Sequence, residues 1–496
     1  MDATRTALFT LASPESRGIR SSAILAFLDA AERQVQHLHS LILLRRGALV
    51  AEGYWEPYGP EYRHTMYSLS KSFTSTAIGL LVAEGRLSVD DHVLSFLPDE
   101  APAQPSANLR AMRVRDLLTM TTGHDADTTR NLRNGDASWV TAFLAEPVAH
   151  KPGTHFVYNS GASYMLSAIA QRLTGQRLLE YLQPRLFAPL GIEKPTWEAS
   201  PEEIDAGGWG LNITTRDIAR FGLLYQQGGV WQGQRLLPEA WVNEATARHV
   251  PNGPSSNPDW EQGYGYQFWR CRHGAYRGDG AFGQLCVVFP RQEAVLAITA
   301  GTLTMQLVLD LAWEHLLPAM GANSLPEDRA GQSALATRLA SLRLPTVAGQ
   351  CRAAVATEVS GKTYCLDANE SGFDAMSFDF REDGATITIR NAAGEQPVVC
   401  GFGVWTRGEA SLDRPRLGTD LARPERVAAS GAWIDDRTYV AQICWYETPY
   451  LQTLTCRFDG ADIAIERRVN VSFGPLILPT LTGRAAARIA RQPTAD

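Results

Sequence analysis

Cysteine is scarce in this sequence, and long apolar runs are missing from it. The seven cysteines lie between Cys271 and Cys456, their number is odd, and no C-x-x-C pair occurs. This usage argues against a disulfide framework and against zinc held by cysteine pairs, and it favours a cytoplasmic protein, with export by an unrecognised route as the alternative. No apolar run approaches the roughly 18–20 residues of a membrane-spanning helix. The longest candidate, Met305–Leu317, is interrupted by Asp310 and Glu314.

Charge of one sign is also lacking. The chain carries 46 basic and 53 acidic residues, a net charge of −7, without long blocks of either sign. No basic surface for nucleic acid or for an anionic membrane is therefore predicted. Residues 1–18 lack the apolar region and cleavage site of a signal peptide. The composition, 45% hydrophobic and 20% charged, is that of a globular protein, and 496 residues exceed what one hydrophobic core usually holds.

The order of the predicted elements indicates an α+β domain at residues 1–320. A helix is predicted over Ser22–Gln36, a hairpin around Arg46-Gly47, and a second helix from Ser68 to Glu84. Residues 87–239 are mainly helical in pattern, residues 263–301 alternate like antiparallel strands, and Met305–Leu317 has the spacing of a covering helix. This pattern predicts an antiparallel sheet flanked by helices, plus a helical subdomain.

The composition changes after residue 320. Residues 321–354 indicate a linker, and residues 355–484 contain short alternating strands separated by turn signals such as Asp459-Gly460. This pattern is typical of a β-barrel or a β-sandwich. We therefore expect a second, all-β domain over 355–484, followed by a tail at 485–496.

The most informative short motif is Tyr67-Ser68-Leu69-Ser70-Lys71, at the start of a predicted helix. Residues three apart on a helix share one face, so the Ser68 hydroxyl and the Lys71 amine are expected to meet. A lysine in an apolar pocket loses its charge and can take the serine proton, and a helix N-terminus favours a developing oxyanion. The same spacing also occurs by chance, as a helix cap beside a solvated amine.

Two further segments could complete a nucleophilic site. Tyr158 and Ser160 follow a loop, and a phenol near a lysine ammonium is expected to have a lowered pKa and to relay a proton. Gly278-Asp279-Gly280-Ala281 opens a predicted strand, where glycines would let a substrate lie close to the backbone. Taken singly, Tyr158 is equally a half-buried aromatic residue, and the glycine-rich segment is equally a hairpin turn.

Together and in this order, the three segments resemble the serine β-lactamase-like superfamily. The branch is that of class C β-lactamases, D-alanyl-D-alanine carboxypeptidases and related esterases and amide hydrolases. The resemblance covers about residues 22–317 and includes RVRDLLTMTTG and WGLNITTRDIARFGLLY. It implies that Ser68 is the acylated nucleophile, that Lys71 is its partner in proton transfer, and that Tyr158 is the second general acid or base.

The resemblance also implies how substrate would be held. It makes Ser160 an orienting hydrogen-bonding residue and places Asp279 and Gly280 in the substrate-binding segment. The backbone N–H groups of Ser68 and Ala281 would form the oxyanion hole. In related hydrolases, an appended β domain is often lipocalin-like.

The third segment departs from the family pattern. Lactamases and carboxypeptidases carry K-T-G or H-T-G where this chain has Gly278-Asp279-Gly280, which lacks a cation. A carboxylate there would repel a penicillin carboxylate by on the order of 1 kcal/mol at ~4 Å in bulk water. Arg272 or Arg277 could supply a displaced cation. The departure favours an esterase or amidase over an efficient β-lactamase.

Other residues carry less weight. His37 and His39 could share one face of a strand, but no third ligand accompanies them, so we expect no metal ion. Asp116 and Asp217 are expected to cap or pair within helices. Seven aromatic residues could line an acyl pocket or could simply be core: Trp55, Tyr58, Trp209, Tyr264, Tyr266, Phe268 and Trp269.

We therefore expect a serine hydrolase that cleaves a small ester or amide through an acyl-Ser68 intermediate, with no cofactor. One alternative is a β-lactamase or D-stereospecific peptidase acting on β-lactams or peptides. Another is a non-hydrolytic, penicillin-binding-like protein. The partner predicted is a small-molecule ester, amide or peptide, and the oligomeric state stays open.

Overall fold

The computed structural model describes residues 9–134, 138–412 and 424–486. The chain divides into two compact units, the first comprising residues 1–54 and 59–342 and the second residues 55–58 and 343–496. The division at residues 342 and 343 falls in the segment for which a linker is predicted. None of the described helices combines the length and the hydropathy that a membrane crossing requires.

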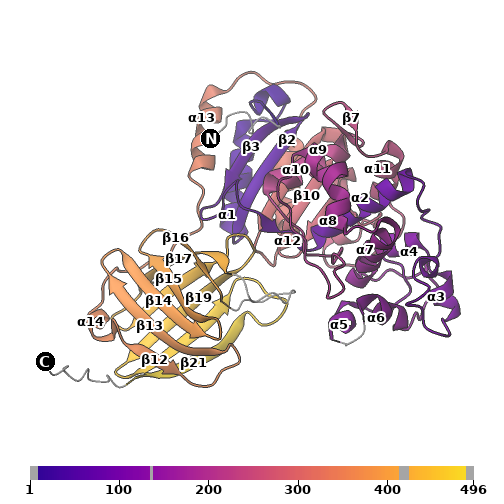
Figure 1. Ribbon diagram of the computed structural model, residues 1–496. Coiled ribbons are helices and arrows are strands. Elements are labelled where there is room, and N and C mark those ends of the chain that lie inside the picture. Colours follow the sequence, from indigo (N-terminus) through magenta and orange to yellow (C-terminus); the bar gives the residue numbers. More distant parts are fainter. Residues whose placement is uncertain (1–8, 135–137, 413–423, 487–496) are drawn as a thin grey trace. The chain divides into compact units, whose positions relative to one another are not determined.

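Unit 1 is built on a sheet of seven described strands (Figure 1). The strand order is β1-β3-β2-β11-β10-β9-β8, and all neighbours are antiparallel except β1 and β3. The bounds are β1 Thr10–Leu11, β2 Leu38–Arg45, β3 Ala48–Tyr54, β8 Trp269–Arg270, β9 Tyr276–Gly280, β10 Gln284–Phe289 and β11 Ala294–Ala300. Strands β2, β10 and β11 are buried along their whole length, which explains their continuous apolar runs.

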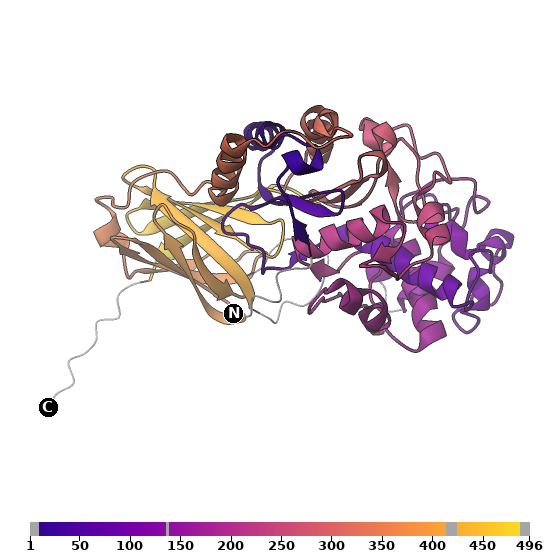
Figure 2. The ribbon, with the colours of Figure 1, turned by 90° about the horizontal axis from the view of Figure 1, so that it is seen from above.

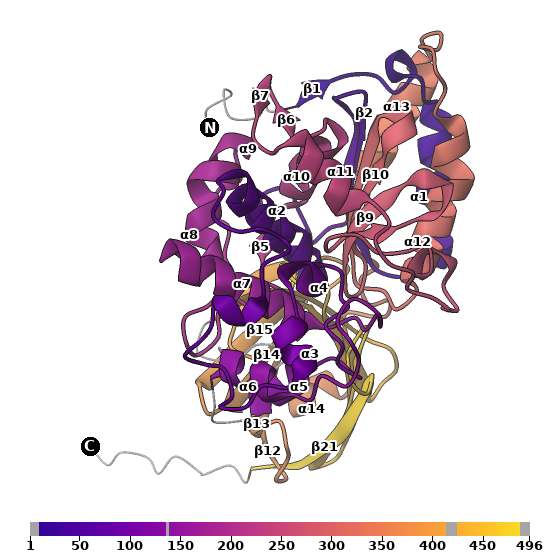
Figure 3. The same ribbon diagram turned by 90° about the vertical axis from the view of Figure 1, so that its right-hand side faces the viewer.

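Helices cover both faces of this sheet (Figure 3). Helices α1 (Ser21–Gln34), α12 (Met305–Leu311) and α13 (Arg329–Ala340) pack together on one face, and α10 (Thr215–Gln226) packs against β2, β10 and β11 on the other. A Cβ on Gly222 of α10 would lie 2.5 Å from Val295 Cγ1, so this helix needs glycine to approach the sheet so closely.

The helical subdomain surrounds α2 and α7, which pack against each other. Its helices are α2 Ser70–Ala83, α3 Ala107–Ala111, α4 Val114–Leu118, α5 Thr129–Asn134, α6 Trp139–Ala145, α7 Ser160–Thr174, α8 Leu178–Leu182, α9 Ala188–Leu190 and α11 Glu239–Thr246. Short strand pairs accompany them: β4 His64–Thr65 with β5 Asn212–Ile213, and β6 Val230–Trp231 with β7 Gln234–Arg235. The predicted α+β domain with a helical subdomain is confirmed.

Unit 2 is a closed β-barrel, which decides between the predicted barrel and sandwich. Over the described residues its strands run β15-β14-β13-β12-β21-β20-β19-β18-β17, and a parallel pairing of β15 with β17 closes this ring of nine. Strand β16 pairs with β17 beside the ring. The bounds are β12 Thr363–Leu366, β13 Phe373–Arg381, β14 Gly384–Asn391, β15 Gly394–Gly401, β16 Thr406–Ala410, β17 Glu425–Trp433, β18 Thr438–Cys444, β19 Leu451–Asp459, β20 Asp462–Val469 and β21 Ile477–Ala485, with α14 Ala356–Val359.

Aromatic side chains fill the barrel. In Figure 2 the orange and yellow strands face each other across its interior. The rings of Phe380 and Trp433 lie 4.7 Å apart between centroids, and those of Phe378 and Phe458 lie 5.1 Å apart. Alternate residues of each strand point inward, which is why the sequence alternates here.

Residues 55–58 belong to the barrel unit although they lie between β3 and β4 in the chain. The Tyr58 hydroxyl donates to the carbonyl of Thr448 (3.0 Å), and Arg407 Nη2 donates to the carbonyl of Pro57 (3.0 Å). Trp55 and Tyr58, two of the aromatic residues considered for an acyl pocket, are therefore part of unit 2.

Candidate active site

Ser68 lies in a short turn rather than in the long helix predicted to begin with it. A 3-10 turn spans Tyr67–Leu69, and α2 begins at Ser70. Tyr67 has a φ of +46°, in the left-handed region, and the Ser70 hydroxyl stabilises this backbone by donating to the Tyr67 carbonyl (2.6 Å) and accepting from the Leu211 N–H (3.1 Å). The turn leaves Ser68 half-buried at the N-terminal end of α2.

Lys71 is buried, and its amine meets three neutral oxygens. Nζ lies 2.9 Å from Ser68 Oγ, 3.0 Å from Ser160 Oγ and 2.8 Å from the carbonyl oxygen of Gly208. Burial lowers the pKa of Lys71 to about 7, against the opposing charges of Asp127 and Asp279. A neutral amine keeps two N–H donors, enough for Ser160 and Gly208, and its lone pair is then free to accept the Ser68 proton.

Tyr158 completes the contacts of Ser68, and its ionisation differs from the expectation. The half-buried ring stacks on Trp269 at 5.3 Å between centroids, and Lys71 Nζ lies 4.8 Å from its centre. Burial raises the pKa of Tyr158, the negative charge of Asp279 adds to this, and a hydrogen bond with Ser68 opposes it. The predicted lowering of this pKa was wrong, because Lys71 is itself close to neutral and the largest charge effect on Tyr158 comes from the Asp279 carboxylate. Tyr158 therefore keeps its proton at neutral pH.

Ser160 is held at the start of α7. The Asn159 side chain caps this helix by accepting from the Gly161 N–H (3.0 Å), and Asp127 Oδ1 accepts from the Ser160 N–H (3.1 Å). A Cβ on Gly161 would lie 2.0 Å from Thr128 Oγ1, so the loop before α5 packs tightly against this turn. Ser160 Oγ consequently faces Lys71.

The glycines of the third segment make room for other atoms of the protein itself. A Cβ on Gly280 would lie 2.0 Å from the Met66 carbonyl oxygen, and one on Gly278 would lie 2.5 Å from Leu69 Cδ1. Strand β9 thus lies directly against the turn that carries Ser68. This packing places Ala281, the residue after β9, at the same end of the strand as the Ser68 turn.

Asp279 does not stand as an isolated carboxylate. Arg277 Nε donates to Asp279 Oδ2 at 2.8 Å, and both side chains are buried. Burial raises the pKa of Asp279, and the charges of Arg277 and Lys71 oppose this. Arg272 contacts Asp259 (2.8 Å) and Asp310 instead. Of the two arginines considered as a displaced cation, Arg277 is thus bound to Asp279, and Arg272 is paired with Asp259 and Asp310.

Gln267 links three helices around the site, α2, α4 and α7, and no sequence motif indicated it. Its Oε1 accepts from Ser163 Oγ on α7 (2.6 Å), and its Nε2 donates to the carbonyls of Leu117 (3.1 Å) and Leu118 (3.2 Å) on α4. Its own carbonyl accepts from Ser72 Oγ on α2 (2.9 Å). The Gly208 carbonyl and Asp127 were also not identified from the sequence, since both reach Lys71 and Ser160 only through the tertiary fold.

The remaining candidates have structural contacts. Asp116 and Asp217 cap their own helices, as expected, accepting from the N–H groups of Arg113 (2.8 Å) and Thr214 (3.0 Å). His39 Nδ1 lies 3.1 Å from His64 Nε2, and among the described residues no group of three His, Cys, Asp or Glu is placed to hold a metal ion.

Of the aromatic residues in unit 1, Tyr264 and Trp269 pack near Tyr158. Trp209 contacts Trp139. Phe268 packs on Tyr225 in the core.

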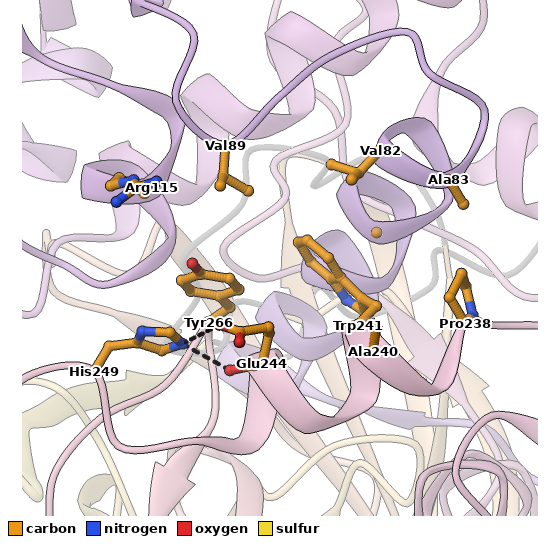
Figure 4. Close-up of a pocket in the computed structure, with 11 residues that line it drawn as sticks. Val82, Ala83, Val89, Arg115, Pro238, Ala240, Trp241, Glu244, His249 and Tyr266 are labelled. Carbon is orange, nitrogen blue, oxygen red and sulfur yellow. Dashed lines mark hydrogen bonds and ion pairs between the residues drawn. The ribbon is translucent and has the colours of Figure 1, made fainter.

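A pocket of about 460 Å³ lies elsewhere on unit 1 (Figure 4). One end is apolar, with Val82, Ala83, Pro238 and Trp241, and the other carries Arg115, Glu244, His249 and Tyr266. His249 Nε2 lies 2.7 Å from the Glu244 carbonyl oxygen, and its ring stacks on Tyr266. Of the residues considered from the sequence, Tyr266 lines this pocket, whereas none of the other candidates does: Ser68, Lys71, Tyr158, Ser160, Asp279, Gly280 and Ala281.

Comparisons with known proteins agree with the geometry. Residues 30–316 match the model of the Beta-lactamase family. A 6-aminohexanoate-dimer hydrolase from Paenarthrobacter ureafaciens is 26% identical over 307 residues, which cover 58% of this chain and 78% of that protein. Penicillin-binding protein 4 from Amycolatopsis lactamdurans is 27% identical over 300 residues, covering 52% of this chain and 77% of its own length.

A solved structure shares the fold. A candidate 6-aminohexanoate-dimer hydrolase from Bacillus anthracis superposes with a TM-score of 0.54 at 21% identity, covering 66% of this chain and 90% of its own.

Proposed function

The chain belongs to the Beta-lactamase family, and from that membership we propose that it is a serine hydrolase that cleaves a small ester or amide through an acyl-Ser68 intermediate. The observation that carries the proposal is the 2.9 Å contact between Ser68 Oγ and a buried Lys71 amine whose pKa is about 7. With this pKa, about half of the Lys71 side chains are neutral at pH 7. The neutral form is then abundant enough to accept a proton, and it is still basic enough to take one from Ser68.

In the acylation step, neutral Lys71 takes the proton of Ser68 Oγ, and the oxygen attacks the substrate carbonyl carbon. The backbone N–H groups of Ser68 and Ala281 stabilise the resulting oxyanion. Collapse of this intermediate breaks the bond to the leaving group, which receives a proton from the hydroxyl of Tyr158 as Tyr158 regains one from the Lys71 ammonium. The products of this step are a Ser68 ester and the free alcohol or amine.

In the deacylation step, water attacks the Ser68 ester. Lys71, neutral again, accepts the water proton directly or through Tyr158, and Ser68 leaves with that proton. Ser160 and the Gly208 carbonyl hold the amine in place throughout, through bonds of 3.0 and 2.8 Å.

Amide substrates are supported by the relatives, since a 6-aminohexanoate-dimer hydrolase aligns over 78% of its length. Asp279, in place of the expected cation, disfavours penicillins, whose carboxylate it would repel. All seven cysteines are free thiols, which supports a reducing compartment such as the cytoplasm.

Intact-mass analysis after treatment with a fluorophosphonate tests the nucleophile. We expect one adduct on the wild type and none on Ser68→Ala. Ser75→Ala is the matched control, because Ser75 lies on α2 and its buried hydroxyl has no hydrogen-bond partner among the described residues. Labelling of Ser68→Ala equal to wild type would refute the proposal. Steady turnover of a chromogenic cephalosporin, lost in Ser68→Ala, would favour the lactamase alternative.

A further inference from the structure

Arg277 and Asp279 form a buried ion pair, and the two partners differ in their exposure and in their effect on the reactive groups. Arg277 is completely buried, whereas Asp279 keeps 7% of its surface exposed. The carboxylate acts on both Lys71 and Tyr158, raising the pKa of each, and its effect on Tyr158 exceeds the opposing effect of Arg277. Along β9, Asp279 is also next to Gly280, which packs on the Met66 carbonyl beside the Ser68 turn, so the carboxylate is the member of the pair nearer that turn along the strand.

The guanidinium is held by several contacts where it stands. In addition to the 2.8 Å bond from Nε to Asp279, Nη1 donates to the carbonyl of Asp259 (2.7 Å) and to Cys271 Sγ (3.1 Å), and the group lies 4.1 Å from the ring centre of Trp260. Nη2 is buried without a hydrogen-bond partner among the described residues, and no part of the side chain is exposed to a substrate. Because arginine does not lose its proton in proteins, Asp279 has a permanent cation 2.8 Å away, which favours its ionised form.

Asp279 is also joined to the aromatic side of the site. A hydrogen bond from the Trp269 side chain reaches the carboxylate, and the Trp269 ring stacks on Tyr158 at 5.3 Å. The carboxylate is thus fixed by two donors on neighbouring strands. Because the carboxylate is held in place, it does not move away when a charged substrate binds. Its electrostatic effect on the substrate is therefore not reduced by reorientation.

We propose that the Arg277–Asp279 pair sets the charge selectivity of the Ser68 site, with Asp279 as the specificity-determining residue. Esters and amides that carry a carboxylate close to the scissile carbonyl are rejected, and neutral or cationic ones are accepted. This inference rests on the proposed serine-hydrolase function. It adds to that function the class of acyl group that the enzyme takes.

The test uses three p-nitrophenyl esters that share a leaving group and differ in the end of a short acyl chain. They are the pentanoate, the monoester of glutarate, and the 4-(trimethylammonio)butanoate. For the wild type, we expect kcat/KM for the anionic ester to be at least about tenfold below that for the neutral ester, a modest ratio for charges a few ångströms apart near a protein surface. The cationic ester should match or exceed the neutral one.

Asp279→Asn removes the carboxylate and leaves the Arg277 charge uncompensated. The ratio of anionic to neutral kcat/KM should then rise at least about tenfold, and the cationic ester should become the poorest. Asp379→Asn is the matched control: Asp379 also pairs with an arginine two residues away on a strand, through the 2.7 Å contact with Arg381, but it is exposed and lies in unit 2. Its ratios should equal those of the wild type.

The double variant Arg277→Gln with Asp279→Asn keeps the test valid if Asp279→Asn alone fails to fold because Arg277 is left buried and unpaired. It removes both charges and keeps an amide pair able to hydrogen bond, so its anionic-to-neutral ratio should lie between those of the wild type and Asp279→Asn. Ratios that stay at the wild-type value in both variants would overturn the inference while leaving the hydrolase proposal intact. Absence of wild-type turnover of every ester, together with absence of Ser68 labelling, would overturn both.

Discussion

The ionisation of Lys71 can be tested by removing a neighbouring charge. Asp127 is exposed, and its charge raises the pKa of Lys71. Its Oδ1 also accepts from the Ser160 N–H at 3.1 Å, and an asparagine keeps that acceptor. Asp127→Asn therefore changes charge with little change in geometry. We expect it to lower the pKa of Lys71 further and to move the onset of activity to lower pH.

The size of the wild-type effect follows from the buried amine. A fall of the Lys71 pKa from 10.5 to about 7 corresponds to about 5 kcal/mol favouring the neutral form. Roughly one-tenth of the enzyme then carries neutral Lys71 at pH 6 and roughly nine-tenths at pH 8. If the neutral amine is the base, the rate of Ser68 acylation should rise about tenfold over this interval and level off above it.

The assay is the second-order rate of fluorophosphonate labelling between pH 5.5 and 8.5, followed by intact mass. In Asp127→Asn the midpoint should move to lower pH, with a similar plateau. Asp125→Asn is the control, because Asp125 is exposed and pairs with His150 Nε2 at 2.8 Å. A wild-type rate that falls as the pH rises would refute Lys71 as the base. So would equal midpoints in all three proteins.

Three further results are expected. Lys71→Met should abolish labelling and yet stabilise the fold at pH 7 by up to about 4 kcal/mol, because at this pH the unfolded lysine is fully protonated and the folded one only about half protonated. Wild-type stability therefore rises from pH 7 towards 10.5, so the advantage of the variant in urea unfolding should shrink by pH 9; an advantage independent of pH would contradict this. Gly280→Ala should lower the melting temperature and the labelling rate, since its Cβ would meet the Met66 carbonyl at 2.0 Å, whereas Gly408→Ala, with open space, should change neither. Gln267→Leu should cost roughly 1–3 kcal/mol for each buried group left unpaired and lower kcat more than it raises KM, and Gln267→Glu should not restore kcat, because a carboxylate cannot donate to the Leu117 and Leu118 carbonyls.

Local patterns were sufficient where the contact is local. The three-residue spacing of Ser68 and Lys71 predicted a meeting that the structure records at 2.9 Å, and alternation along the chain predicted the β domain. The 3-10 turn at Tyr67 was not predicted, because the left-handed φ there depends on Ser70 and Leu211 from a distant loop. Closure of the barrel could not be predicted either, because the parallel pairing of β15 with β17 does not change the alternation of apolar and polar residues in either strand.

Two further differences from the sequence-based expectations have the same origin. The pKa of Tyr158 was expected to fall beside an ammonium, but the same burial that brings the ring to Lys71 also removes the lysine charge. The glycines of β9 were expected to make room for substrate, whereas Gly280 makes room for the Met66 carbonyl. In each case the sequence correctly indicated that the residue matters at this position. Its role depends on neighbouring groups that only the tertiary fold brings into contact with it.

Lys71 and Arg277, the two buried basic residues of the site, show how neighbouring groups determine whether a buried side chain keeps its charge. Over the described residues Lys71 has no carboxylate within salt-bridge distance and meets two hydroxyls and one carbonyl, so desolvation wins and the amine approaches neutrality. Arg277 is equally buried, but a carboxylate at 2.8 Å keeps it charged. A carboxylate bound directly to Lys71 would hold its proton and remove the base. Placing Asp279 on Arg277 avoids this, and it leaves one fixed negative charge near a lysine that can still give up its proton.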